Sequence, residues 1–484
     1  MIGSRFFWTL GMGCCGVLFG SLSGAEDPEK VPAKEKVSVT AIVGADIHTV
    51  SREVIRAGTV LFAEGKITAV GQGVQVPEGA TVIDARGKQI TPGFVAIDMA
   101  RIGLGGAGAS NRLADVLDPF DRNVTLSLAV GITSGCVQTG EGGASARGRR
   151  RNPEDVFLGL EPQSEQLLRT ADTVELSYGV AESVCACCGL PILPSDPISD
   201  PPPRDITTTG NAVIKMSYGS IDGMLLKENA FYDVSRGSLS GALNHHTWRG
   251  QIEKARQYLK DQAAHEQAIR EGKKEPPPRK TASDGLLALV RGEVRLRIGA
   301  SSASEIREMI RLARELDYPL VLSDVVEGWL VADLLAEHEV LVSFTPRVRR
   351  AARDNREEES GSWIEQSRVL QQTGVPFALT TLSNSISLDG LAGRDLTSLP
   401  LEAAFAVRGG CSESEALKAV TLTPAKMLGV ADRIGSIEVG KDADLLILDG
   451  APLDYRTYVE TAFVNGRIVY QRARDRVLPV FERR

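Results

Sequence analysis

The segment TPGFVAIDMARIG, residues 91–103, has the form of a strand that ends in a functional site. A Pro-Gly turn precedes the apolar run Phe94 to Ile97, which ends at Asp98, with Arg101 shortly after it. A carboxylate at a strand end can bind a hard cation or exchange a proton with a substrate. The position of Asp98 therefore makes this strand end the first candidate for chemistry.

Histidine, the neutral side chain best suited to zinc, is scarce in this chain. The five histidines are His48, His245, His246, His265 and His338. His245 and His246 are neighbours, and adjacent side chains diverge by about 100° on a helix, so they are poorly placed to chelate one metal. His265 and His338 fall in charged helical segments and are expected to face solvent. These histidines are not expected to form a multi-histidine metal site.

Cysteine gives no clear metal signal either. Cys14 and Cys15 lie in an N-terminal apolar run, and the remaining five are Cys136, Cys185, Cys187, Cys188 and Cys411. An odd number leaves at least one thiol unpaired in a monomer. The CACCG segment is compatible with a metal knuckle, a local disulfide or buried thiols. Zinc would need a fourth ligand from elsewhere, so a disulfide or an inert loop is favoured.

The N-terminus is typical of a secretory signal peptide over residues 1–25. Arg5 precedes the apolar run FFWTLGMGCCGVLF, and the small residues SGA stand before the expected cleavage point. The run is short and rich in glycine, which disfavours a membrane anchor, and lipid modification of Cys14 is a minor alternative. The sequence therefore predicts export to the periplasm, the cell envelope or the medium, with no stable membrane span after cleavage.

The bulk composition is that of an ordinary globular protein, with 484 residues, 43% hydrophobic and 24% charged. This length suits one large barrel with a smaller attached module. The net charge of −7 and an aromatic content of 5% argue against nucleic acid as a partner.

Two kinds of pattern divide the chain. GTVLFAEGKITAVGQG contains two alternating runs joined by Glu64-Gly65-Lys66, which predicts a β-hairpin, and similar strands return near the C-terminus. Between these ends, buried strands alternate with amphipathic helices, and one helix is predicted over 305–316. Such alternation indicates an α/β fold, most simply a (β/α)8 TIM barrel, with a small β-sandwich domain formed from the N- and C-terminal segments.

The predicted boundaries are a signal peptide at 1–25, a linker at 26–36, the N-terminal segment of the β-sandwich at 37–91, the barrel at 92–430, the C-terminal segment of the β-sandwich at 431–475 and a tail at 476–484. Within the barrel, the Pro-rich stretches 189–210 and 271–281 are expected to be surface loops. The basic cluster SARGRRRN, residues 145–152, is interpreted as an exposed loop, with an anion or partner patch as the alternative.

Several segments together resemble the amidohydrolase superfamily, in its imidazolonepropionase-like and dipeptidase-like branch. They are GTVLFAEGKITAVG, IDARGKQITPGFVAID, GITS, EALKAVTLTPAKMLGVADRIGSIEVGKDADLLILDG and VNGRIVY. The resemblance implies hydrolysis of C–N bonds by a water that one or two divalent cations activate. It also implies ligands at strand ends: His-x-His after strand 1, often a carboxylated lysine on strand 4, histidines on strands 5 and 6, and an aspartate on strand 8.

The residues at these expected ligand positions differ from the family pattern. The His-x-His pair aligns with Asp98 and Ala100, and the strand 6 histidine aligns with Asp324. The strand 5 histidine aligns with Gly299, or with Ser301 in a shifted register. Because alanine and glycine offer no side-chain donor atom, the resemblance implies a degenerate metal site.

The two remaining family positions complete this picture. The strand 8 aspartate aligns with Leu382, next to Thr381, and the strand 4 lysine with Lys215 in AVIKMSYG. Leucine likewise cannot bind a metal, so no metal ligand is predicted with assurance. The residual pocket candidates are Asp98, Lys215, Asp324, Glu327 and Thr381.

Two functions follow from these positions. The first is a non-catalytic homologue without a cofactor, retained for binding or assembly, with a small-molecule ligand in the barrel mouth. Its partners would be a second copy of itself or an active relative. The second is an active hydrolase with a changed site, in which Asp98, Asp324, Glu327 and Lys215 hold one divalent cation or act without metal as acid and base.

Overall fold

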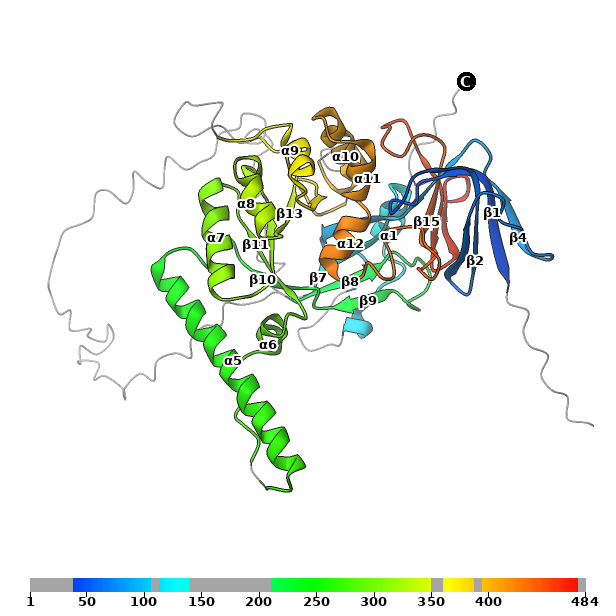
Figure 1. The fold of residues 1–484 in the computed structure, drawn as a ribbon. Helices are drawn as coiled ribbons and strands as arrows, with labels where there is room; N and C mark the ends of the chain where they lie inside the picture. The colour runs from blue at the N-terminus through cyan, green and yellow to red at the C-terminus, as the bar shows by residue number, and fades with distance from the viewer. Residues whose placement is uncertain are drawn as a thin grey trace, which may run out of the picture. The chain divides into compact units, whose positions relative to one another are not determined.

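The computed structural model describes residues 38–105, 113–139, 210–274, 276–349, 360–386 and 394–477. The predicted signal peptide, the linker, the basic cluster and the CACCG cysteines lie outside these residues. Within them, no helix is long and apolar enough to cross a bilayer. The described strands form three sheets (Figure 1).

The largest sheet joins the two ends of the described chain. Its path runs β17-β16-β15-β5-β1-β2-β3, and β4 pairs with β1. The strands are β1 (Val39–Ile47), β2 (Ile55–Ala63), β3 (Lys66–Gly71), β4 (Thr81–Asp84), β5 (Gln89–Pro92), β15 (Leu445–Leu448), β16 (Val459–Val464) and β17 (Arg467–Gln471). The junction is the antiparallel pair β5–β15, in which Ile90 faces Ile447. The two terminal segments therefore form one β-rich domain, as predicted, but its strands belong to a single sheet and not to the two sheets of the predicted β-sandwich.

The predicted hairpin is present at the expected turn. Strand β2 ends at Ala63 and β3 begins at Lys66, so Glu64 and Gly65 alone form the turn. Both have positive φ, 51° and 77°, which is the backbone conformation that matches a two-residue turn to the twist of a hairpin. Glycine adopts it without strain, and this explains why the turn signal was readable in the sequence.

The second sheet carries the predicted strand and helix alternation. It has the order β10-β11-β12-β13-β14, and every neighbouring pair is parallel. Its strands are β10 (Phe231–Val234), β11 (Arg295–Gly299), β12 (Leu320–Ser323), β13 (Leu341–Phe344) and β14 (Phe377–Leu379). Parallel strands with intervening helices confirm the α/β class and give a TIM-barrel-like domain.

The third sheet departs from a regular barrel. It has the order β6-β7-β8-β9, with β6 (Phe94–Met99), β7 (Ile132–Gln138), β8 (Asn211–Lys215) and β9 (Leu225–Glu228). Strands β6 and β7 are parallel, but β8 is antiparallel to both β7 and β9. The described strands therefore form two separate sheets rather than one closed ring of eight parallel strands.

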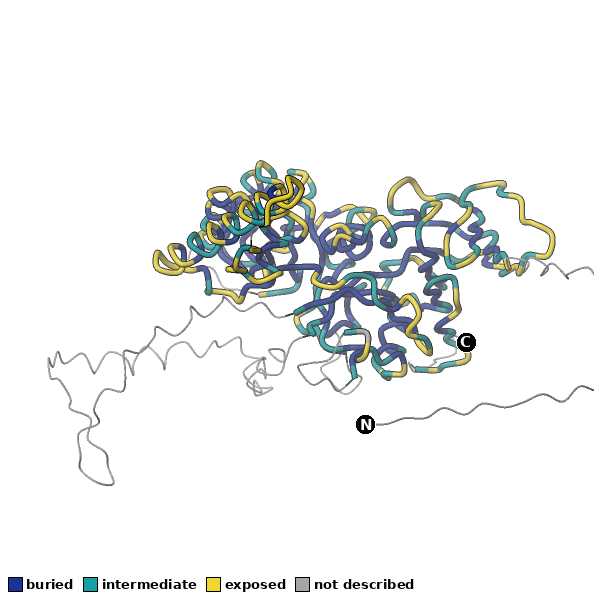
Figure 2. Tube along the Cα trace, turned by 90° about the horizontal axis from the view of Figure 1, so that it is seen from below, coloured by how far each residue is buried: buried dark blue, intermediate teal, exposed yellow. Residues whose placement is uncertain are grey.

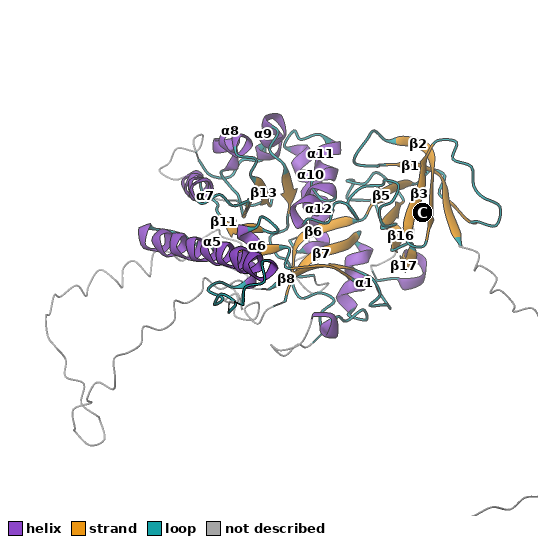
Figure 3. Cartoon of the chain, turned by 60° about the horizontal axis from the view of Figure 1, so that its bottom comes forward, coloured by secondary structure: helices purple, strands orange, loops and turns teal. Residues whose placement is uncertain are grey.

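Helices and short 3-10 turns occupy the connections, and α7, α8 and α9 lie outside β11 and β13 (Figure 3). The helices are α1 (Arg122–Ala129), α5 (Ala242–Arg270), α6 (Asp284–Val290), α7 (Ala303–Glu315), α8 (Ala332–Glu337), α9 (Gln366–Thr373), α10 (Leu399–Arg408), α11 (Glu413–Lys418), α12 (Leu422–Leu428) and α13 (Arg472–Asp475). The 3-10 turns are η1 (Leu113–Val116), η2 (Gly328–Val331) and η4 (Leu396–Ser398).

Helix α7 shows why the alternation could be predicted. Ser302 caps its first turn in a reciprocal capping box with Glu305. The apolar residues at helical spacing, Ile306, Met309, Ile310 and Ala313, are buried. Buried residues are concentrated in the interior, whereas loops and the outer faces of helices are exposed (Figure 2).

Candidate functional site

The first predicted site residue, Asp98, lies at the end of β6 beside the loop that follows β14. Asn384 Nδ2 donates to Asp98 Oδ2 at 3.2 Å, and the backbone amide of Ala100 donates to the Asn384 carbonyl at 2.6 Å. The other carboxylate oxygen, Oδ1, is buried and has no hydrogen-bond partner among the described residues. Only one of the two carboxylate oxygens of Asp98 thus accepts a hydrogen bond from the described residues, and the other could accept one from a ligand.

A buried ion pair lies next to Asp98. Arg297 on β11 donates to Asp233 on β10 through Nε at 2.5 Å and Nη2 at 2.8 Å, a bidentate arrangement. The two residues are register partners in the parallel sheet. Arg297 is 8% exposed and Asp233 is 9% exposed, so the pair is essentially withdrawn from water.

Arg297 also connects the two sheets of the barrel-like domain. Its Nη1 donates to the carbonyl of Ile97 on β6 at 3.2 Å, and its guanidinium lies 4.6 Å from the centre of the Phe231 ring. Burial alone would lower the pKa of Arg297, but the Asp233 carboxylate outweighs it and raises that pKa. The guanidinium is thus permanently charged, and the Asp98 carboxylate also contributes to raising its pKa.

Arg297 lies on the same face of β11 as Gly299, the residue at the expected strand 5 ligand position. Side chains two apart on a strand point the same way. A Cβ added at Gly299 would lie 3.4 Å from both the Asp324 carboxylate and the Arg236 side chain. The space for a histidine is therefore bordered by these two charged groups.

Asp324, which follows β12, is the second predicted site residue near Asp98. Its backbone has a positive φ of 55°, an uncommon conformation that aspartate tolerates better than most residues. The residue is exposed by its accessible area, but neighbouring protein atoms still displace part of the water around its carboxylate. This partial desolvation, with the Asp98 carboxylate as the next cause, raises the pKa of Asp324. Asp98 and Asp324 therefore form an acidic pair that is unfavourable when both are ionised.

Arg236 lies beside Gly299, as Asp324 does. Its Nη2 donates to Ser301 Oγ at 2.5 Å and lies 3.2 Å from the Glu305 carboxylate. Burial would raise the pKa of Glu305, but the amides of Ser302 and Ser301, together with Arg236, lower it to about 2. Ser301, the alternative strand 5 position, thus hydrogen-bonds to Arg236 and Glu305 at the start of α7.

Lys215 does not join the strand ends that carry Asp98. In the register it pairs with Ser134, and Ser134 pairs with Val95, at the beginning of β6 rather than its end. This placement follows from the antiparallel direction of β8, whereas the family pattern assumed a parallel strand. The predicted grouping of Lys215 with Asp98 is therefore not found.

The amine of Lys215 is instead fully buried against the β-rich domain. Its Nζ lies 2.7 Å from Asp442 and 2.8 Å from Asp444, and it donates to Asn465 Oδ1 at 2.6 Å. Burial raises the pKa of Asp444 despite the nearby lysine. Lys215 thus links the barrel-like domain to the β-rich domain, because Asp444 directly precedes β15 and Asp442 lies shortly before it.

The remaining predicted positions have structural partners or lie apart. Glu327 is buried and accepts from the amides of Ala303 at 2.9 Å and Gly361 at 3.0 Å. Thr381 donates to the Ser383 carbonyl at 2.8 Å, and Leu382 is exposed. Glu327 therefore anchors the start of α7 through the Ala303 amide.

Among the described residues, histidines and cysteines form no metal centre. All five histidines lie in the described chain, and among its residues no group of three or more His, Cys, Asp or Glu side chains could hold a metal ion. His338 was expected to face solvent, but its side chain is only 12% exposed because it ends α8 against α7. Cys136 and Cys411 are buried free thiols, and burial raises the pKa of each to about 12.

The sequence reasoning missed Asp233, Arg297 and Asn384. A signal for Arg297 was present, since RLRIG places this arginine between two apolar residues at the buried centre of a strand, where charges occur only when paired. FYDV, the sequence of β10, has the matching feature at Asp233. The two could have been paired if adjacency of β10 and β11 had been known.

The fold and the strand-end site define an α/β protein with a TIM-barrel-like domain and a β-rich domain. An amidohydrolase from Thermotoga maritima MSB8 has a similar structure, with a TM-score of 0.60 and 23% identity, covering 90% of this chain and 100% of that one. The model of the amidohydrolase family matches residues 330–470. Residues 330–470 are therefore similar to the amidohydrolase family, and the fold of the chain is similar to that of an amidohydrolase.

Two curated proteins are similar to short parts of this chain. Imidazolonepropionase from Syntrophobacter fumaroxidans is 42% identical over 85 residues, which is 17% of this chain and 19% of that protein. N-acetylglucosamine-6-phosphate deacetylase from Mus musculus is 39% identical over 62 residues, or 13% and 14% of the two chains. The alignments thus span less than a fifth of the length of these relatives.

Proposed function

We propose that the protein is an exported, non-catalytic amidohydrolase homologue with a role in binding or assembly. In this proposal the mouth of the barrel-like domain holds a small-molecule ligand, and the chain forms a homodimer or pairs with an active relative. Export rests on the signal-like segment at the N-terminus. The family resemblance supplies the scaffold, whereas activity depends on residues placed on it.

The observation that carries the proposal is the buried Arg297 guanidinium beside Asp98. A family metal centre would place divalent cations at these strand ends. The guanidinium is a fixed positive charge at this place, and a like-charged metal ion beside it would be repelled. Arg297 already forms an ion pair with Asp233 and interacts electrostatically with Asp98 and Asp324. The carboxylates of this site therefore have a positively charged partner without a metal.

The residue types at the other expected positions support the same interpretation. Ala100, Gly299 and Leu382 have no side-chain donor atom. Lys215 is engaged by Asp442 and Asp444, so it is not free to carry the bridging carboxylate of the family pattern. The residues present do not fit a two-metal centre, and the proposal assigns no reaction step to a metal.

A second function is supported by the pair Asp98 and Asp324. The pKa of Asp324 is raised by its partial burial and by the Asp98 carboxylate, while one oxygen of Asp98 lacks a hydrogen-bond partner within the described chain. A carboxyl group with a raised pKa suits the role of general acid, and a second carboxyl group near it suits that of general base. An active, metal-free hydrolase is therefore the competing proposal.

The experiment that separates the two is a hydrolysis assay on untagged mature protein. Substrates are N-acetylglucosamine 6-phosphate and a panel of simple amides, with zinc, manganese or EDTA present. The non-catalytic proposal expects the rate of the buffer blank under every condition, for the wild type and for D98N/D324N alike. Hydrolysis that survives EDTA and is lost in a folded D98N/D324N variant would refute it and establish the acid and base pair.

A further inference from the structure

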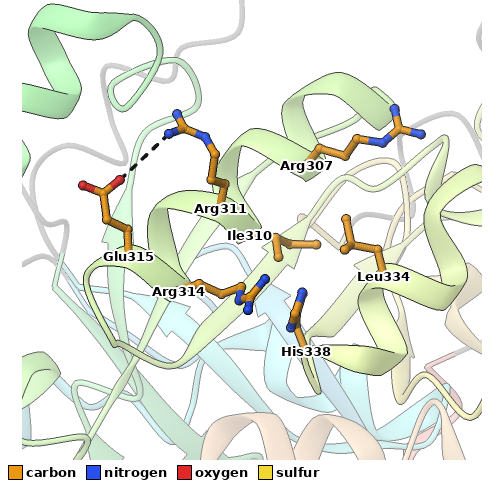
Figure 4. A pocket seen from close by; sticks show the side chains of 7 residues that line it. All are labelled: Arg307, Ile310, Arg311, Arg314, Glu315, Leu334 and His338. Carbon is orange, nitrogen blue, oxygen red and sulfur yellow. Dashed lines mark ion pairs between the residues drawn. The ribbon is translucent and has the colours of Figure 1, made fainter.

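A pocket of about 360 Å³ lies on the outer side of the barrel-like domain, between α7 and α8 (Figure 4). Its charged lining comes from α7, through Arg307, Arg311 and Arg314. Its apolar floor is Ile310 from α7 and Leu334 from α8. These helices follow β11 and β12, so the pocket is distinct from the strand-end site of Asp98.

The three arginines form one stripe because they are spaced four and three residues apart on a helix. All three are exposed. Like charges at this spacing repel each other by a few tenths of a kcal/mol per pair, so the stripe slightly destabilises α7 when nothing neutralises it. A bound anion would remove this repulsion and gain charge-assisted hydrogen bonds from the guanidinium groups.

Little of this positive charge is neutralised by the protein. Arg307 and Arg314 have no acidic partner within the described part of the chain, and Arg311 lies 3.9 Å from Glu315. Glu315 is shared, because it also forms a bidentate pair with Arg249. Even if Glu315 cancels the charge of one of the three arginines, the lining keeps a net charge of +2. The whole chain, in contrast, has a net charge of −7.

His338 provides a second, independent observation. It ends α8 beside Arg314 in the lining (Figure 4), and its Nε2 atom is buried without a hydrogen-bond partner among the described residues. The Glu337 carboxylate is 3.8 Å away, beyond a hydrogen bond. A buried polar atom without a partner is uncommon and is satisfied when a ligand oxygen reaches it.

We propose that this pocket binds a small organic dianion of the phosphate-monoester class. The arginines and His338 receive the phosphate oxygens, and the apolar part of the ligand covers Ile310 and Leu334. A phosphomonoester supplies close to two negative charges at neutral pH and three acceptor oxygens, which matches the net charge of the lining. The site is independent of the proposed loss of metal chemistry.

The test is calorimetric titration of untagged mature protein with phenyl phosphate. Inorganic phosphate and benzoate serve as comparison probes, since the first lacks the apolar part and the second carries a single charge. Phenyl phosphate is expected to bind most tightly, with a Kd of about 1 mM or below. The R307Q/R314Q variant removes the two unpaired arginines and should weaken binding about tenfold or more.

The matched control is R408Q/R467Q, which removes two exposed arginines from α10 and β17, away from the pocket lining. It should bind phenyl phosphate as the wild type does, and both variants should keep the wild-type circular dichroism spectrum because the altered side chains are exposed. Three results would overturn the proposal: no saturable binding of phenyl phosphate, equal affinity for benzoate, or equal weakening in the two double variants.

Discussion

Replacing Arg297 with leucine tests whether the buried ion pair organises the strand-end site. Arg297 is 8% exposed and makes two bonds to Asp233 and one to the Ile97 carbonyl. Its loss leaves the Asp233 carboxylate buried with only Asn211 as a side-chain donor among the described contacts. Breaking a buried pair in this way costs about 3–5 kcal/mol of unfolding free energy.

The assay is urea denaturation of R297L, of D233L/R297L and of R56Q. The double variant should recover most of the loss, because replacing both members of a buried pair by apolar groups is often neutral or better. Arg56 pairs with Asp46 on the surface, where its side chain is 71% exposed, and R56Q should cost about 1 kcal/mol or less. A loss below about 1 kcal/mol for R297L would refute the view that this charge is buried and structurally required.

Four further outcomes are expected. K215M should lower the denaturation midpoint strongly at pH 7, since it leaves two buried carboxylates without their lysine. The folded-state pKa of Asp442 is lowered, so its contribution to stability is present above its unfolded pKa and should be lost as pH falls below about 4 through the folded value, which a pH series of melts would detect. The pH dependence from Asp324 has the opposite direction, because its pKa is raised in the folded state, so its contribution to stability is present at low pH and is lost as pH rises. D324N should therefore stabilise the protein at pH 7 but not at pH 3. G93A should destabilise by about 1–3 kcal/mol in urea, because the added Cβ would overlap the Thr133 side chain.

Local patterns in the sequence predicted the elements that local physics determines. The hairpin at Glu64-Gly65 and the amphipathic face of α7 are confirmed, because turn chemistry and helical periodicity are encoded in neighbouring residues. The joining of both terminal segments into one β-rich domain also followed from their shared pattern of short strands.

Strand direction was not encoded locally, and this is where the site prediction departed from the structure. Nothing in the run AVIKMS reveals that β8 is antiparallel to β7, yet that direction moves Lys215 away from the end of β6. The partner of Arg297 was equally hidden, since Asp233 lies 64 residues earlier in the chain. Asp98 and Asp324 were found because each directly follows or ends a recognisable strand.

The most direct test of the central claim is the metal content of the protein purified without a histidine tag. It would be dialysed against zinc and manganese, then against metal-free buffer, and measured by elemental analysis. A site occupied by Arg297 and lacking donors at Ala100, Gly299 and Leu382 predicts less than about 0.1 ion per chain. Close to one tightly held ion per chain, lost in D98N/D324N, would contradict the account and make those carboxylates ligands of an active centre.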